Sequence, residues 1–335
     1  LSPDSDLALA MEYHDTNQFE LEWRILASAL QNNPENKDIQ GKFFLLQAGF
    51  GVHPTIAIGP NNTNFQLVKA TMIAEPFTRE MATGIALLGM GESNLATKCF
   101  ERAVQYRPNI VDGWAWLAIS RAKTDPVLAK AAIDRALITQ PLNTQTWILV
   151  AQYHLTAAEQ KQAELIYRNV LASEPDNVSA LLGLGMAISD SDLVGSLTSL
   201  THASELVPGD PQVWISLAEV SLRGNGYIRE IALPALDRAQ SLEPSDPRVY
   251  LLRGRAWLAL NELTKARSAL EQADLLSTTQ SQHAEAAYYY GLVLLQQGEK
   301  EMAEAKFLAL AEKFPASPWA TEAGKVLQNL ARPVR

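Results

Sequence analysis

The sequence predicts an all-α fold in which antiparallel helix hairpins stack into a solenoid. The first observation behind this prediction is a period of about 34 residues, a length typical of a two-helix repeat. Prolines that can end a helix recur, by subtraction of their numbers, at intervals of 33, 34, 33 and 36 residues; they are Pro108, Pro141, Pro175, Pro208 and Pro244. The second observation is that side chains of the same size return at the same place in each interval.

The size pattern inside one interval predicts close packing between two helices. A large side chain such as Trp114 or Trp214 opens the first helix, and the second helix carries a small, a bulky and again a small residue, as at Ala266, Leu270 and Ala273. Spacings of four and then three place such residues on one helical face. A hairpin of this kind cannot bury its apolar face alone, so we expect it to stack on copies of itself.

The composition is that of a globular protein. The chain has 335 residues, of which 47% are hydrophobic and 19% are charged. No stretch approaches the run of about 20 apolar residues that a membrane-spanning helix needs, so we expect no membrane insertion. The net charge is −9 and no run of basic residues occurs, which leads us to exclude nucleic acid as a partner. The single cysteine, Cys99, excludes an intramolecular disulfide.

The recurring pattern of an aromatic residue, a small residue, then Ala, a bulky residue, Ala and Pro resembles the tetratricopeptide repeat (TPR). It is clearest over 247–280, with Tyr250, Gly254 and Trp257, and over 284–317, with Gly291. The resemblance implies a right-handed superhelical solenoid whose first helices line a concave face.

The chain is predicted to be a single TPR-like solenoid over 1–331, with about eight repeats. In order we expect a first repeat over 3–36, an irregular or degenerate unit over 37–76, seven consecutive repeats over 77–317 and a capping helix over 318–331. A capping helix is expected where the last apolar face would otherwise meet water.

The unit over 37–76 departs from the pattern. Helices are predicted over 38–48 and 65–73, and 55–58 is a short β-branched stretch followed by a turn signature. Two explanations stay open: drift of one repeat, or a loop adapted to reach the groove. A smaller irregularity, at 224–226, predicts a longer hairpin turn.

The resemblance also implies where a ligand binds. Carried over residue by residue, the family's concave positions give these candidate partner-binding residues: Ile148, Gln152, Leu182, Met186, Ile215, Glu219, Leu251, Arg255 and Tyr288. Relatives that clamp acidic chaperone tails use Lys and Asn at such positions, and this chain does not. We therefore expect an apolar groove that binds a protein or peptide presenting apolar side chains.

The sequence shows no motif for catalysis. A P-loop, a dinucleotide-binding glycine turn, a nucleophile elbow and a His-Glu-x-x-His pair are all missing. We therefore predict no catalytic, cofactor-binding or metal-binding residues, no cofactor, and a protein that is not an enzyme.

The sequence favours a binding scaffold and leaves two other functions open. One is a self-association module that forms a homo-oligomer, and the other is an accessory domain of a larger enzyme. The chain begins at Leu1 rather than at Met, so we expect that a segment preceded it. The compartment stays open between the cytoplasm and an extracytoplasmic domain of a longer chain.

Overall fold

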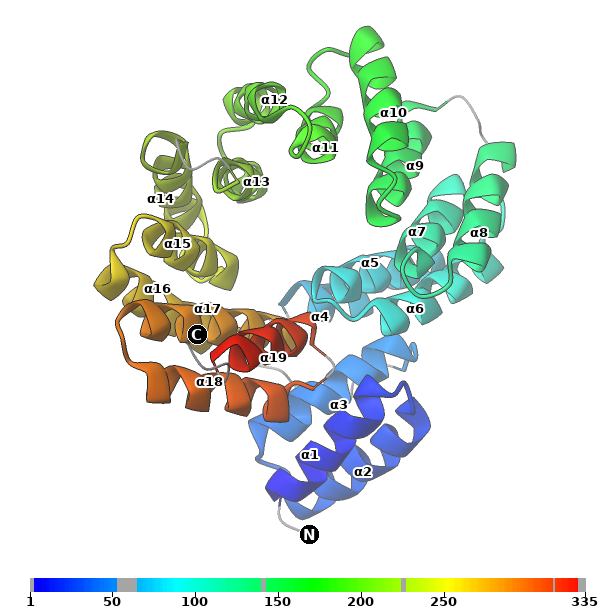
Figure 1. Ribbon diagram of the computed structural model, residues 1–335. Coiled ribbons are helices and arrows are strands. Elements are labelled where there is room, and N and C mark those ends of the chain that lie inside the picture. The colour runs from blue at the N-terminus through cyan, green and yellow to red at the C-terminus, as the bar shows by residue number, and fades with distance from the viewer. Residues whose placement is uncertain (1–2, 53–64, 140–142, 224–226, 316, 331–335) are drawn as a thin grey trace. The chain divides into compact units, whose positions relative to one another are not determined.

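The computed structural model describes residues 3–52, 65–139, 143–223, 227–315 and 317–330. It divides into two compact units, Leu1–Ala158 and Glu159–Arg335. Within each unit, consecutive helices pack as antiparallel hairpins (Figure 1). The described residues form helices and turns and no strand, which confirms the all-α prediction. The possible strand at 55–58 lies outside the described residues.

Nine α-helices lie in the described part of the first unit. They are α1 (Pro3–Asp15), α2 (Phe19–Asn32), α3 (Lys37–Gly49), α4 (Phe65–Thr71), α5 (Pro76–Gly89), α6 (Ser93–Tyr106), α7 (Val111–Arg121), α8 (Pro126–Thr139) and α9 (Thr144–Thr156). The helices predicted over 38–48 and 65–73 are therefore present as α3 and α4.

The second unit continues the alternation of first and second helices. It contains α10 (Gln160–Ser173), α11 (Val178–Ile188), α12 (Leu193–Leu206), α13 (Pro211–Ser221), the π-helix η2 (Ile228–Ala232), α14 (Leu233–Leu242), α15 (Pro247–Ala259), α16 (Leu263–Leu276), α17 (Gln280–Gln296), α18 (Lys300–Lys313) and α19 (Pro318–Leu330). How the helices of both units group into repeats of one solenoid stays a prediction.

Prolines and acidic caps define the helix ends. Pro108 and Pro244 each follow the last residue of a helix by two positions, as the proline period predicts. Pro211 and Pro247 occupy the first turns of α13 and α15, where a missing N–H costs nothing. The Asp246 side chain caps α15 by accepting a hydrogen bond from the Arg248 N–H.

The wide turn η2 precedes Pro234 in α14. In a regular α-helix the ring of Pro234 would press against the carbonyl group of Glu230. A π-helical turn widens the backbone at this point, which gives the ring room. The longer turn predicted at 224–226 lies outside the described residues.

Glycines allow the two helices of a hairpin to touch. A methyl group added at Gly254 would lie 2.5 Å from Leu270 Cγ, and one added at Gly291 would lie 2.5 Å from Phe307 Cε1. Carbon atoms do not approach so closely without displacement. In these two hairpins the small residue in the middle of the first helix therefore limits the distance to the second helix, as the size pattern predicts.

The helix α19 covers the last hairpin of the second unit. Ala320 and Ala323 are buried in one apolar cluster with Phe307 and Leu310 of α18, and Trp319 packs against the same cluster. The helix expected over 318–331 to cap the array is therefore present over Pro318–Leu330, and it shields apolar surface as expected.

Candidate functional site

Three of the nine predicted groove residues are core residues. The exposed fractions are 7% for Ile148, 2% for Ile215 and 8% for Leu251. In the second unit, Ile215 belongs to a buried cluster against which Leu182 and Met186 pack. Ile148, Ile215 and Leu251 therefore do not present the open apolar surface that the sequence led us to expect, because neighbouring helices cover them.

The other predicted residues lie closer to the surface. Gln152, on α9, is half-buried in the first unit. In the second unit the half-buried residues belong to four successive first helices, α11, α13, α15 and α17; they are Leu182, Met186, Glu219, Arg255 and Tyr288. We call this surface the first-helix face of the second unit. Leu222, the residue that follows α13, and Leu258, near the end of α15, are also half-buried.

Arg255 joins α15 to α17 through two contacts. Its Nη1 lies 3.7 Å from Glu285 Oε1, and its guanidinium lies 5.1 Å from the centre of the Tyr289 ring. A cation over an aromatic face is attracted by the ring's electron density. The sequence analysis missed Glu285 and Tyr289, although their spacing of four places them on one side of α17, where they could meet a charge on the preceding first helix.

Arg248, at the start of α15, is 45% exposed and binds two polar partners, Asp246 and Gln212. Its Nη2 donates to Asp246 Oδ2 at 2.7 Å, its Nε lies 3.0 Å from the same oxygen, and its Nη1 donates to Gln212 Oε1 at 2.7 Å. The charges of Asp246 and Glu219 raise the pKa of Arg248, although burial alone would lower it. This arginine is held in the α13–α15 contact.

Glu219 is a half-buried carboxylate without a direct partner among the described residues. It forms no hydrogen bond or ion pair there, and it acts on Arg248 and Glu285 only through its charge. Burial raises the pKa of Glu285, Arg255 lowers it in part, and the like charge of Glu219 raises it further. The guanidinium groups of Arg248 and Arg255 are already paired with other residues. The first-helix face therefore carries a carboxylate, that of Glu219, which has no paired counter-charge among the described residues.

Three aromatic side chains form a cluster beside Arg255. The ring centroids of Tyr288 and Trp319 are 5.2 Å apart, and those of Tyr289 and Trp319 are 5.5 Å apart. All three side chains are half-buried. Tyr, Trp and Arg are the residues most enriched at the centres of protein interfaces. We call Tyr288, Tyr289 and Trp319 the aromatic cluster.

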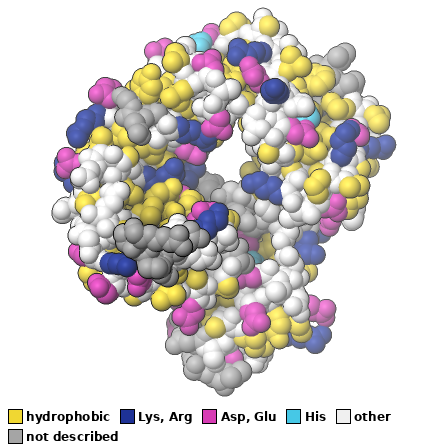
Figure 2. Space-filling model, in the orientation of Figure 1, with side chains coloured by type: hydrophobic (Ala, Val, Ile, Leu, Met, Phe, Trp, Pro, Cys, Tyr) yellow, Lys and Arg dark blue, Asp and Glu magenta, His cyan; other side chains and the backbone are white. Residues whose placement is uncertain are grey.

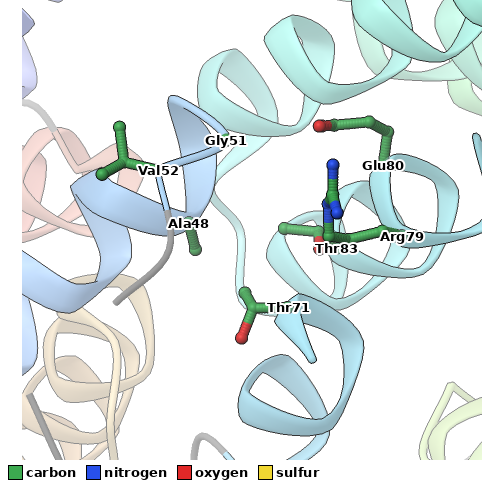
Figure 3. A pocket seen from close by; sticks show the side chains of 7 residues that line it. All are labelled: Ala48, Gly51, Val52, Thr71, Arg79, Glu80 and Thr83. Carbon is green, nitrogen blue, oxygen red and sulfur yellow. The ribbon is translucent and has the colours of Figure 1, made fainter. Parts of the chain in front are cut away.

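A small hollow in the first unit lies between α3, α4 and α5 (Figure 3). Its volume is about 10 Å³, roughly the space of one water molecule, and Thr71, Arg79, Glu80 and Thr83 contribute polar groups to its wall. Glu80 points towards Gly51 (Figure 3) and is held by Arg102, whose Nη2 donates to Glu80 Oε2 at 2.8 Å. This ion pair also reaches the Gly49 carbonyl group at 2.8 Å, so the pair ties α3, α5 and α6 together.

A second hollow lies between α12 and η2 in the second unit. Its volume is about 380 Å³, and its wall is mainly apolar, with Leu197, Tyr227 and Ile231 among the lining residues. Among the described lining residues, polar groups come from Thr198, Thr201, His202, Glu205 and Tyr227.

The described surface shows neither a metal centre nor a membrane span. No group of three or more His, Cys, Asp or Glu side chains among the described residues could hold a metal ion. No described helix is both long and apolar enough to cross a bilayer. Figure 2 shows acidic and basic side chains mixed over one view of the surface, with hydrophobic patches between them.

Comparison with known proteins gives a family and a fold. The family described as "Tetratricopeptide repeat" matches residues 229–278 and 274–318. No curated protein matches the sequence.

Several solved structures share the fold at low sequence identity. Human IFIT1, solved as a dimer with m7Gppp-AAAA, is 16% identical, with a TM-score of 0.63 over 98% of this chain and 81% of that chain. Cut9, from the APC/C hetero-tetramer Cut9–Hcn1, is 12% identical, with a TM-score of 0.62 over 94% of this chain and 61% of that chain. A tetratricopeptide repeat protein from Parabacteroides merdae is 16% identical, with a TM-score of 0.53 over 76% and 99% of the two chains.

The prediction that excluded nucleic acid as a partner is wrong. Human IFIT1 has this fold and is solved with a capped RNA, so the fold is compatible with an RNA ligand. The error lies in the use of net charge, which sums the whole surface, whereas a ligand is held by a local group of side chains. The charge of −9 therefore does not decide the class of partner.

Four observations indicate the same fold: the repeat pattern of the sequence, the helix hairpins in contact through their small residues, the family match and the fold shared with solved structures. Residues 229–318 therefore match the tetratricopeptide-repeat family, and the chain shares its helical fold with solved tetratricopeptide-repeat proteins.

Proposed function

We propose that the chain is a non-catalytic scaffold that binds another protein on the first-helix face of its second unit. The observation that carries this proposal is the partial exposure of apolar side chains on that face, at Met186, Leu222 and Leu258, beside the aromatic cluster. Apolar and aromatic side chains left half-covered on consecutive helices gain free energy when a partner covers them.

The fold supports this proposal in general terms. Tetratricopeptide-repeat proteins are typically protein-interaction scaffolds without catalytic activity, and Cut9 is solved in a complex with Hcn1.

The proposal also narrows the groove that the sequence predicts. Ile215 and Leu251 form the floor beneath the surface, and Met186, Glu219, Arg255 and Tyr288 remain as the residues that a partner could touch. Leu182 borders them on α11.

Substitution on the face tests the proposal. We expect Met186→Glu and Leu258→Glu to abolish capture of a partner from a lysate of the source organism, because each places a carboxylate where apolar surface must be covered. The matched control is Leu308→Glu on the second helix α18, where the leucine is 59% exposed; it should leave capture unchanged. Melting temperatures of all three variants report whether each one folds.

Two results would contradict the proposal. One is capture that survives both face substitutions. The other is binding of a capped RNA oligonucleotide that the same substitutions remove, which would identify the face as an RNA site. Light scattering across concentration separates self-association from binding of a different protein.

A further inference from the structure

The first-helix face holds a carboxylate that the fold leaves unneutralised. Glu219 lies on α13, and the three guanidinium groups on the following first helix, α15, are engaged elsewhere. Arg248 is bound to Asp246 and Gln212, and Arg255 faces Glu285 and the Tyr289 ring. The third, Arg253, pairs with Asp237 at 2.8 Å. None of the three forms an ion pair with Glu219 within 4.0 Å.

The unbalanced charge lies on the same face as three half-buried aromatic rings. Arg255 bridges from α15 to Glu285 and Tyr289 on α17, and Tyr289 contacts Trp319 on α19. Glu219 interacts electrostatically with Glu285. The order along the face is thus an anionic position, a cation–aromatic contact and the aromatic cluster.

We propose that this face docks a partner segment that places a lysine or arginine beside Glu219 and an apolar side chain on the aromatic cluster. The inference rests on the proposed function and adds the chemistry of the partner. Charge complementarity selects the basic residue, since a cation beside Glu219 supplies the missing counter-charge and also offsets the repulsion between Glu219 and Glu285. The half-exposed Tyr288 and Trp319 rings supply the apolar contact.

The same face should reject a segment that carries an acidic residue. A segment with an acidic residue at the same place would bring a third carboxylate next to Glu219 and Glu285, and like charges across an interface are strongly disfavoured. The acidic tails that some relatives bind therefore do not fit this face.

A charge-reversal experiment with a random peptide library tests the inference. The full chain and its Glu219→Arg variant are each panned against a library of random 12-residue peptides displayed on phage. We expect peptides selected on the original chain to share a Lys or Arg a few residues from an apolar residue, and peptides selected on Glu219→Arg to carry Asp or Glu at that place. A synthetic peptide with the selected sequence should bind Glu219→Gln about tenfold more weakly than the original chain, which corresponds to the loss of one charge-assisted contact.

Two matched measurements keep the result interpretable. Glu219 has no direct partner among the residues that the structure describes, so Glu219→Gln and Glu219→Arg should melt at the same temperature as the original chain. Glu312→Arg, on the exposed end of α18, is the control and should select the same peptides as the original chain.

The outcomes separate this inference from the proposed function. One outcome is a set of peptides whose binding is lost in the Met186→Glu variant but which show no preference for a basic residue. This outcome would overturn only the inference about Glu219. An unchanged motif in Glu219→Arg would do the same. Selected peptides whose binding is insensitive to Met186→Glu would overturn the proposed function and this inference together.

Discussion

The His14 Nε2 atom in α1 lies 2.8 Å from Glu92 Oε2, just before α6, although the two residues are 78 positions apart. The other ring nitrogen, Nδ1, lies 2.9 Å from Glu22 Oε2 in α2. Both nitrogens therefore face carboxylates, which is the arrangement of a protonated imidazolium that donates twice. The exposed side-chain fractions are 13% for His14 and 1% for Glu22, so this contact joins the first hairpin to α6 inside the first unit.

The first prediction concerns alkaline pH. Burial alone would lower the pKa of His14, but the hydrogen bonds to Glu22 and Glu92 and their charges raise it to about 9, from 6.5. A raised folded-state pKa stabilises the protein fully below pH 6.5, and this stabilisation disappears as the pH rises through about 9. A shift of this size corresponds to roughly 3 kcal/mol.

Thermal unfolding measured between pH 6 and 10 tests this prediction. The original chain should lose stability between pH 6.5 and about 9, and His14→Gln should start lower and lose less over that range. His202→Gln removes a histidine that is 41% exposed and pairs with Asp176, so it should keep the original slope. Identical slopes for His14→Gln and the original chain would show that this imidazole is not protonated in the fold.

The second prediction concerns the close approach of helices. In Gly254→Ala, the new methyl group would lie 2.5 Å from Leu270 Cγ, and Leu270 is only 1% exposed and cannot move aside easily. We expect a loss of about 1–3 kcal/mol in the free energy of unfolding. Gly324→Ala is the matched control in α19, because its methyl group would meet nothing within 4 Å. It should stabilise by about 0.5–1 kcal/mol, since alanine favours a helix. Equal effects of the two changes in urea unfolding would contradict the packing account.

The third prediction concerns the buried ion pair of the first unit. In Arg102→Met, the Glu80 carboxylate would remain 2% exposed without its partner, and the Gly49 carbonyl group would lose a donor. We expect a loss of roughly 3 kcal/mol, because an unpaired buried charge is costly. Adding Glu80→Leu should recover a large part of this loss. Strictly additive losses in the double variant would show that the two side chains do not depend on each other.

The fourth prediction concerns Ile215, one of the candidate groove residues. In an open groove, Ile215→Glu would reduce binding and leave the melting temperature nearly unchanged. In the structure, Ile215 is 2% exposed inside a core cluster, so the carboxylate would be buried and we expect the second unit to unfold or melt far lower. Met186→Glu, at a half-buried position on α11, should change the melting temperature much less. Circular dichroism melts of the two variants compare them directly, and a stable Ile215→Glu variant would restore the original groove.

The sequence by itself determined the hairpins and their packing code. Helical periodicity is a local property, so the spacing of Ala266, Leu270 and Ala273 identifies a buried face without knowledge of the rest of the chain. A glycine such as Gly254 marks a close helix contact for the same reason, since only a missing side chain permits that distance.

The tertiary structure decided which positions on a first helix are covered. Ile215 and Glu219 are one helical turn apart, and the sequence places both on the inner side of α13. The neighbouring hairpins nevertheless bury Ile215 and leave Glu219 half-exposed. That difference depends on the distance and angle between helices of adjacent hairpins, which no single segment encodes. The contact of Arg255 with Glu285 and Tyr289, and the link from His14 to Glu92, have the same origin: each joins residues that only packing between helices brings together.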